Sequence, residues 1–291
     1  MDLNSYLQQE RYASKTITRY VLRITNFKTW CTKRSLDVEL AQVNDILNYI
    51  KHLRKTQQPL TVSRTLQSVK VYYNYLIAIG SRGDNPVQDI HIQLGKRKLP
   101  IHLLSSDELE DLYYSYETET GQDAYIRATQ VRNRIITGLM VYQGLNASSL
   151  QQLRIEHLQL AKGKLYVPRT RRSNSRVLEL KPWQIMELIQ YKDNLHPILL
   201  TRTHVDFEKL FPVSKFSAVT TVILKKLKTY NQQVKDANYI RASVITNWLS
   251  KYEIRKVQYM AGHKRILSTE FYRQDNLESL QKAIHDFHPL R

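Results

Sequence analysis

One stretch near the end of the chain reads Tyr259-Met-Ala-Gly-His-Lys-Arg-Ile-Leu-Ser-Thr-Glu-Phe-Tyr272, in which Tyr272 follows His263 by nine residues. The spacing of apolar residues predicts helices over 254–260 and 268–273, on either side of the Gly-His pair. A histidine in such a place can donate a hydrogen bond or move a proton, and a tyrosine phenol can act as a nucleophile. In the structural alternatives, His263 caps a helix end and Tyr272 is an ordinary half-buried helix residue.

A second polar group stands upstream, where Asn238-Tyr-Ile-Arg241 opens a predicted helix over 239–250. The planar guanidinium of an arginine donates two parallel hydrogen bonds and stays charged, which suits the non-bridging oxygens of a phosphate. The alternatives for Arg241 are a structural pairing with an acidic side chain or the binding of phosphate without a part in the chemistry. Each role places a fixed cation on a helix that precedes the Gly-His pair.

The pattern changes from helical to alternating in the middle of the chain. Two short strands are predicted at 164–167 and 176–180, joined by the basic turn Arg169-Thr-Arg-Arg-Ser-Asn-Ser175. Few acidic residues lie near this turn in the sequence, so we predict that Arg169, Arg171 and Arg172 contact phosphate groups. Helical patterning elsewhere predicts a mainly α protein with a small antiparallel β-sheet.

Further motifs complete an ordered set. Tyr142-Gln-Gly-Leu-Asn-Ala-Ser-Ser-Leu150 follows a predicted helix, and Asn85-Pro86, Leu99-Pro100 and the capping-box pattern Ser105-Ser-Asp-Glu108 lie between two helical regions. With the Gly-His and Arg241 motifs, this order resembles that of the tyrosine recombinases, or phage-type integrases, including the bacterial chromosome-dimer resolvases. The resemblance covers nearly the whole chain. It argues against a third interpretation, an unrelated helix-turn-helix regulator.

The resemblance implies a two-domain DNA enzyme. An N-terminal helical, SAM-like core-binding domain would occupy residues 1–82, a linker 83–103 and a catalytic-type domain 104–291. Tyr272 would attack a DNA phosphodiester and form a 3′-phosphotyrosine, with Arg241 and His263 assisting. Because the phosphotyrosine retains the bond energy, resealing requires no cofactor and no metal. Family analogy also implies a homo- or hetero-tetramer on DNA, with the amphipathic C-terminal residues Leu277, Leu280, Ile284 and Phe287 docking on a neighbour or on their own domain.

Three positions depart from the family pattern. Asn146 stands where Gly-Leu-Arg-x-Ser-Glu-Leu has its arginine, Arg171 (or Arg172) stands where the hairpin lysine is expected, and Asn238 replaces a histidine that is the least strict member. Loss of one preorganised donor costs on the order of a hundred- to a thousandfold in rate, and arginine is a poor proton donor near neutrality. Arg154 or Lys164 could compensate. The alternative function is therefore a catalytically impaired DNA-binding or architectural subunit that partners an active recombinase.

The N-terminal helices present hydroxyl and basic side chains between their apolar positions, and a short basic run follows in the predicted linker. Such groups contact phosphate oxygens in DNA complexes, although a plain solvated surface is the alternative. The predicted DNA-contacting residues are Thr16, Arg19, Arg64, Ser68, Lys70, Lys96, Arg97 and Lys98.

The overall charge favours a polyanionic partner. The chain holds 44 Lys and Arg against 26 Asp and Glu, a net charge of +18, and residues 1–100 contribute only half of the excess. A field spread over folded sequence attracts phosphate backbones, so double-stranded DNA is the expected partner.

The single cysteine, Cys31, excludes an internal disulfide and a multi-cysteine metal site. With no apolar run of bilayer length and a polar start, we expect a cytoplasmic, DNA-associated protein without a membrane partner.

Overall fold

The computed structural model describes residues 1–95, 99–100, 102–118, 123–203 and 206–273. The chain forms two compact units, Met1–Arg97 and Lys98–Arg291, and their division falls within the predicted linker. Each unit has its own hydrophobic core, and each is described by itself.

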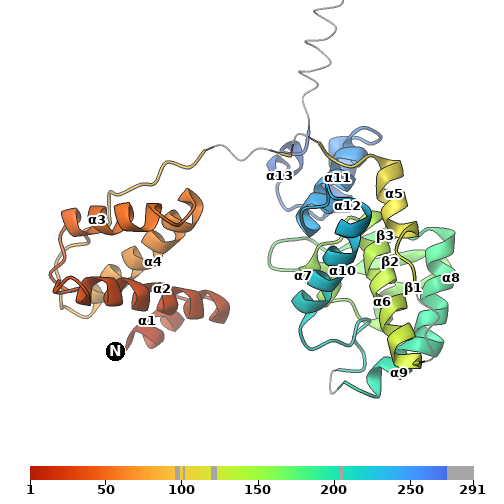
Figure 1. Ribbon diagram of the computed structural model, residues 1–291, viewed down its shortest axis with the longest axis horizontal. Helices are drawn as coiled ribbons and strands as arrows, with labels where there is room; N and C mark the ends of the chain where they lie inside the picture. Colours follow the sequence, from red (N-terminus) through yellow and green to blue (C-terminus); the bar gives the residue numbers. More distant parts are fainter. Residues whose placement is uncertain (96–98, 101, 119–122, 204–205, 274–291) are drawn as a thin grey trace, which may run out of the picture. The chain divides into compact units, whose positions relative to one another are not determined.

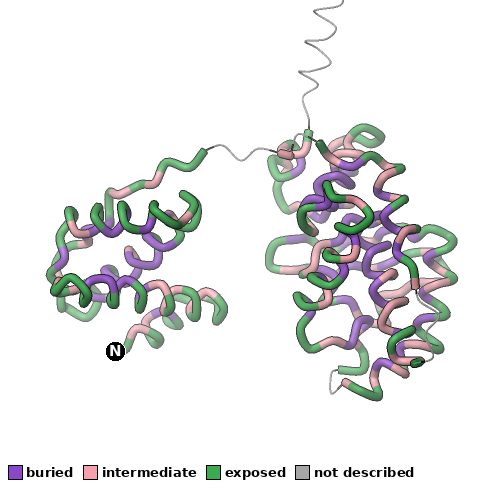
Figure 2. Tube along the Cα trace, viewed as in Figure 1, coloured by how far each residue is buried: buried purple, intermediate pink, exposed green. Residues whose placement is uncertain are grey.

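The first unit is built from helices whose buried sides face one another (Figures 1 and 2). Its elements are α1 (Leu3–Gln9), α2 (Ser14–Thr32), α3 (Val43–Arg54) and α4 (Pro59–Ala78). Phe27 of α2 contacts both Tyr49 of α3 and Tyr73 of α4, at ring-centroid distances of 4.9 and 6.2 Å. Burial of these aromatic rings provides much of the apolar surface that stabilises so small a unit.

Local signals explain most of the boundaries. Pro59 occupies the first turn of α4, where its missing N–H costs nothing, and Gly80 follows α4 with a φ of +75°. The N-cap of α2 is Ala13, and Ser14 is the first helical residue. Part of the predicted linker belongs to this unit, because the Asn85 amide donates to the Lys70 carbonyl at 3.0 Å and Val87 is buried.

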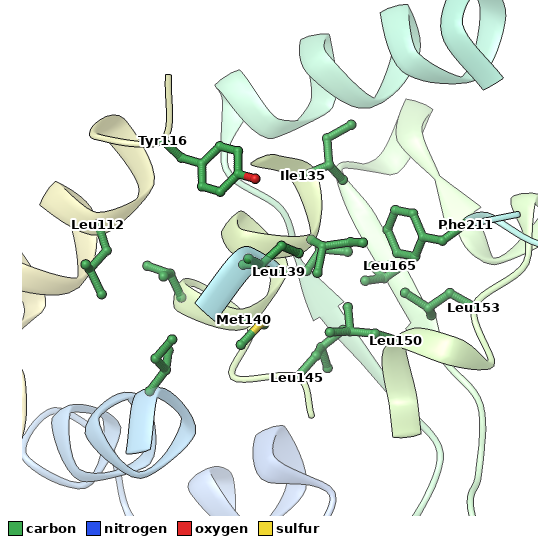
Figure 3. Packing of buried hydrophobic residues seen from close by; sticks show 14 of the residues in the cluster. Leu112, Tyr116, Ile135, Leu139, Met140, Leu145, Leu150, Leu153, Leu165 and Phe211 are labelled. Atoms are coloured by element: carbon green, nitrogen blue, oxygen red, sulfur yellow. The ribbon is translucent and has the colours of Figure 1, made fainter. Parts of the chain in front are cut away.

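The second unit surrounds the long helix α6 (Ala124–Val141), whose residues 135–141 are all buried. Figure 3 shows Ile135, Leu139 and Met140 of α6 packed among leucines from neighbouring elements. The other helices are α5 (Ser106–Tyr114), α7 (Ala147–Gln151), η1 (Ile155–His157), η2 (Leu160–Lys162), α8 (Pro182–Gln190), η3 (Tyr191–Leu195), α9 (His196–Leu200), α10 (Phe216–Tyr230), α11 (Ala237–Leu249), α12 (Ile254–Ala261) and α13 (Leu267–Glu270). The capping box predicted at the start of α5 is confirmed: the Ser105 hydroxyl accepts from the Glu108 N–H, and the Glu108 carboxylate accepts from the Ser105 N–H.

The sheet is small and antiparallel, with the order β1 (Leu158–Gln159), β2 (Lys164–Val167) and β3 (Arg176–Glu179). The two predicted strands pair in a register that sets Val167 opposite Arg176. The two-residue strand β1 was not predicted, because it is too short to show an alternating pattern. A mainly helical fold with a small antiparallel sheet is thereby confirmed. The helix predicted over 268–273 is shorter than expected, since α13 ends at Glu270 and leaves Tyr272 beyond it.

Candidate active site

The structure brings together three side chains that lie far apart in the sequence. Arg241 is in the second turn of α11, and its Nη2 lies 3.3 Å from Nε2 of His263. The ring of His263 in turn stacks on the ring of Tyr272, with centroids 5.8 Å apart and planes 12° from parallel. The predicted convergence of Arg241, His263 and Tyr272 on one place in the fold is therefore observed.

Backbone carbonyls hold Arg241 in position. Its side chain is buried, and its guanidinium donates to the carbonyl of Gly144 and, at 2.6 Å, to that of Ala261. Burial lowers the pKa of the guanidinium, because a low-dielectric environment disfavours the charged form. Fixed on both sides, this cation is oriented before any ligand arrives.

The turn after α12 positions His263. Gly262 has a φ of +71°, and the N–H groups of Gly262 and His263 donate back to the carbonyls of Tyr259 and Gln258 at 2.9 and 3.0 Å. This is the usual way for a glycine to end a helix. On the far side of the ring, Nδ1 lies 2.9 Å from the hydroxyl of the buried Thr269.

The contacts of His263 also define its protonation. Arginine can only donate, so Nε2 must accept from Arg241 and the ring proton resides on Nδ1, which donates to Thr269. Burial, followed by the charges of Arg241 and Arg176, lowers the pKa of His263 to about 4. The imidazole is therefore neutral at physiological pH.

Tyr272 is half-buried just beyond α13. Its carbonyl accepts a hydrogen bond of 3.3 Å from the Thr246 hydroxyl of α11, and its side chain packs beside the small apolar cluster of Ile245, Val257 and Ala261. The backbone bond and the stacking on His263 fix the phenol next to the imidazole.

The basic turn between β2 and β3 docks on the Gly262–His263 turn. The Asn174 N–H donates to the Gly262 carbonyl at 3.0 Å, Ser173 forms an isolated bridge with His263, and Lys264 Nζ donates to the Arg171 carbonyl at 2.8 Å. The side chains of the turn arginines, Arg169, Arg171 and Arg172, are exposed. A basic loop of the hairpin therefore borders the site.

Sequence reasoning missed Arg176 of β3, which is only 2 % exposed and packs against Gly262. Burial and the charge of Arg241 lower the pKa of Arg176 to about 10. The two guanidiniums contact consecutive residues of one turn, because Arg241 donates to the Ala261 carbonyl and Arg176 packs against Gly262. A signal was present: in the alternating pattern of β3, Arg176 shares the inward face with Leu178. Lys264, beside the hairpin turn, was also missed, because its sequence context is an ordinary surface turn.

The positions that depart from the family pattern have other roles or lie elsewhere. Asn146 is the N-cap of α7, where its side-chain oxygen accepts from the Ser149 N–H at 2.9 Å, and Asn238 is exposed in the first turn of α11. Neither suggested substitute is brought to the site: Arg154 pairs with Asp206 and Glu208. Lys164 lies at the other end of the hairpin, in register with Glu179.

The predicted DNA-contacting residues of the first unit differ in exposure. Arg19 and Arg64 are exposed and Thr16 is half-buried, while Lys70 donates to the Gln88 carbonyl at 3.0 Å. Ser68 has no exposed surface and its hydroxyl donates to the Arg64 carbonyl. This burial removes Ser68 from the predicted contact face. Lys96, Arg97 and Lys98 lie outside the described residues, as do Leu277, Leu280, Ile284 and Phe287.

The described part of the chain contains neither a metal-binding cluster nor a helix that could span a membrane. No group of three or more His, Cys, Asp or Glu side chains is arranged to hold a metal ion in the parts of the chain that the structure describes. Across the same residues, no helix has both the length and the apolar character that crossing a bilayer requires.

Comparison with known proteins gives matches over both units. Residues 102–279 match the phage integrase family, and residues 2–80 match the N-terminal SAM-like domain of phage integrases. The tyrosine recombinase XerD of Lacticaseibacillus casei is 27% identical over 296 residues, which cover 99% of this chain and 97% of that protein. A XerC recombinase of Chlorobaculum parvum is 24% identical over 98% of this chain and 92% of its own length.

Solved structures show the same fold. XerH recombinase in a post-cleavage complex with a palindromic difH substrate superimposes with a TM-score of 0.73 at 17% identity, over 97% of this chain and 85% of that one. A lambda integrase tetramer bound to a Holliday junction gives 0.67 at 14% identity, over 94% and 75%.

Proposed function

The chain belongs to the phage integrase family, and on this basis we propose that it is a site-specific recombinase that cuts and rejoins duplex DNA through Tyr272. The observation that carries this proposal is the cluster of Arg241, His263 and Tyr272, three groups suited to one phosphate. The relatives that match over nearly the whole chain are tyrosine recombinases. Nothing in these comparisons favours the alternative of an impaired DNA-binding subunit.

The chemistry follows from the arrangement. Arg241 binds a non-bridging oxygen of the scissile phosphate and stabilises the charge that develops there. The phosphate competes for the hydrogen bond of 3.3 Å between Arg241 Nη2 and Nε2 of His263, so Nε2 is released while the Gly144 and Ala261 carbonyls keep the guanidinium in place. This nitrogen is neutral and adjacent to the phenol, so it can take up the proton of Tyr272. The bond between the phenol oxygen and phosphorus forms while the bond to the 5′-oxygen breaks, and a proton goes to that 5′-oxygen. Reversal of the same steps reseals the strand.

A covalent adduct is the direct test. Repeated selection from a random duplex pool supplies a bound site, and a nick placed near its centre prevents religation. Wild-type protein is expected to accumulate a denaturation-resistant protein–DNA adduct, which Tyr272→Phe does not form although it binds the same duplex. Tyr252→Phe, a change of an exposed tyrosine just before α12, is the matched control and keeps the adduct. Tight binding by wild type without any adduct would establish the alternative, an impaired DNA-binding subunit.

We further propose that several protomers assemble on DNA. Support comes from the solved structures of similar fold, which include a lambda integrase dimer on a core site and a tetramer on a Holliday junction. Light scattering of the protein alone and with the selected duplex tests this, with a rise in protomer number expected only when DNA is present. Truncation after Arg273 then tests whether residues 274–291 carry the protomer contact.

A further inference from the structure

Arg176 is a buried cation, and part of its guanidinium forms no hydrogen bond with the described residues. Its Nη1 donates to the Asn174 carbonyl at 3.3 Å, whereas Nε and Nη2 are buried without a hydrogen-bond partner among the described residues. No carboxylate in the described parts of the chain forms an ion pair with either Arg176 or Arg241. A buried charge without a counterion is unfavourable, so the unpaired edge of Arg176 points to a ligand that completes the site.

The unused atoms have a definite shape. Nε and Nη2 form one edge of the guanidinium, with two parallel N–H bonds that match two oxygens of an oxyanion. The molecule already uses this edge once: Arg82 holds the two carboxylate oxygens of Asp84 through Nε at 2.7 Å and Nη2 at 3.2 Å. In Arg176 the same edge has no hydrogen-bond partner among the described residues. Arg176 packs against Gly262, and Arg241 donates to the carbonyl of the preceding residue, Ala261, so the two cations border the same turn.

We propose that Arg176 is a second phosphate-binding arginine of the active site and takes the place of the arginine missing at Asn146. The inference rests on the proposed function, because the ligand is the scissile phosphodiester. Arg176 and Arg241 then hold the phosphate from two elements, β3 and α11, in an environment where each charge acts strongly. Arg176 of β3 then supplies the second guanidinium of the site, and Asn146 caps α7.

A probe that needs no DNA site separates this inference from the proposed function. Inorganic phosphate is titrated into the full chain while the ring resonances of His263 are followed by NMR. Wild type and Tyr272→Phe are expected to show the same saturable shift, since phosphate engages Arg241 and frees Nε2. Arg176→Gln should weaken phosphate binding about tenfold or more, the loss expected for two charged hydrogen bonds. Arg202→Gln, a change of an exposed arginine of the second unit that lies outside the predicted contact residues, should change it less than about twofold.

Two outcomes overturn the inference: no saturable shift in wild type, or Arg176→Gln binding phosphate as wild type does. Should Arg176→Gln fail to fold, Arg176→Lys carries the test, because a lysine keeps the charge and loses the fork. Several-fold weaker binding by that variant is expected, and unchanged binding would contradict a bidentate role.

On the selected duplex, a neutral methylphosphonate at the scissile position gives a second readout. Arg176→Gln is expected to form adduct on the order of a hundred- to a thousandfold more slowly than wild type on normal DNA. The rate deficit should be smaller on the methylphosphonate, because this group carries no negative charge for Arg176 to neutralise. An equal deficit on both substrates indicates a structural role and refutes phosphate binding. A failure of wild type itself to form adduct counts against the proposed function alone.

Lys264 carries a separate inference, from a different observation. Its Nζ donates to the Arg171 carbonyl at 2.8 Å. The Lys264 ammonium group therefore contacts the hairpin turn, where the family's lysine is expected and this chain has arginine. Ammonium groups release a proton more readily than guanidinium groups do. We infer that Lys264, again assuming the proposed function, gives its proton to the 5′-oxygen as the bond between that oxygen and phosphorus breaks.

A sulfur atom in place of the bridging 5′-oxygen tests this role. A thiolate leaves without protonation, since a thiol ionises near pH 8.5 whereas water ionises near 15.7. Lys264→Ala should therefore lose about a hundredfold or more of its cleavage rate on normal DNA and little on the sulfur substrate. Arg171→Ala is the matched control, and its loss of cleavage rate should be the same on normal DNA and on the sulfur substrate. Equal loss by Lys264→Ala on both substrates, or selective rescue of Arg171→Ala, would overturn the inference.

Discussion

The guanidinium of Arg176 occupies the space into which a side chain at Gly262 would project. A Cβ built on Gly262 would lie 2.5 Å from Nη1 and 2.9 Å from Cζ of Arg176. Gly262 thus has two reasons to be glycine: the left-handed backbone that ends α12, with a φ of +71°, and the cation that packs against it. The contact couples the hairpin to the turn that presents His263.

Gly262→Ala should destabilise the protein by more than backbone strain alone. The left-handed conformation costs an alanine about 1–2 kcal/mol, and displacement of Arg176 adds to this cost. Gly80→Ala is the matched control, because Gly80 has a φ of +75° with nothing within 4 Å of its Cβ. Urea unfolding should show a larger loss of unfolding free energy for Gly262→Ala than for Gly80→Ala. The excess should fall in an Arg176→Ala background, and its persistence there would mean that the clash is not with Arg176.

The lowered pKa of His263 predicts a dependence of stability on pH. Its folded-state value of about 4 lies below the ordinary 6.5, so the unfolded chain binds more protons between these values. Stability is therefore fully present above about pH 6.5 and is lost as the pH falls toward 4. Comparing urea unfolding of wild type and His263→Gln at pH 7 and pH 5 isolates this contribution. Wild type should lose more free energy of unfolding than the variant, and parallel losses would show that the imidazole is not desolvated.

The exposed basic residues of the first unit predict a measurable salt effect. Arg19→Glu and Arg64→Glu should each weaken binding to the selected duplex. Each should also flatten the plot of log affinity against log salt by about 0.9 per lost phosphate contact. Lys51→Glu on α3, an exposed lysine outside the predicted face, changes the net charge equally and should leave the slope nearly unchanged. Identical slopes in all three variants would mean that the excess charge acts only as a general field.

Periodicity and residue chemistry predicted the large elements because those signals are local. The apolar stripes of α2 and α4, the Ser105–Glu108 capping box and the two strands of the hairpin each follow from a short pattern. Tyr272, His263 and Arg241 were predicted in the same way, through spacing within motifs. The contacts that bring them together involve Gly262, Thr246 and Thr269, whose roles become visible only in three dimensions.

What the sequence could not show are the contacts between distant segments. Lys264 reaches the Arg171 carbonyl across 93 residues of chain, and Arg176 meets Gly262 only because the hairpin folds onto α12. Arg154 and Lys164 were considered as replacements for the family's arginine and lysine because they lie nearby in the sequence. In the fold, Arg154 pairs with acidic side chains, and strand register places Lys164 at the other end of the hairpin. Ser68 likewise follows the polar residue Gln67 in the sequence, yet in the fold it has no exposed surface.

Arg176→Met should stabilise the free protein while abolishing its chemistry. Methionine has a similar length, and replacing an unsatisfied buried cation by an apolar side chain removes a desolvation cost, so we expect a gain of about 1–4 kcal/mol by analogy with buried ion pairs. A higher Tm in the absence of DNA, together with loss of adduct on the nicked duplex, is the expected result. Arg241→Met is the informative contrast, because that guanidinium already donates to two carbonyls and its removal leaves both unpaired, which should lower the Tm. A fall in Tm for both variants would mean that Arg176 is satisfied in the free protein.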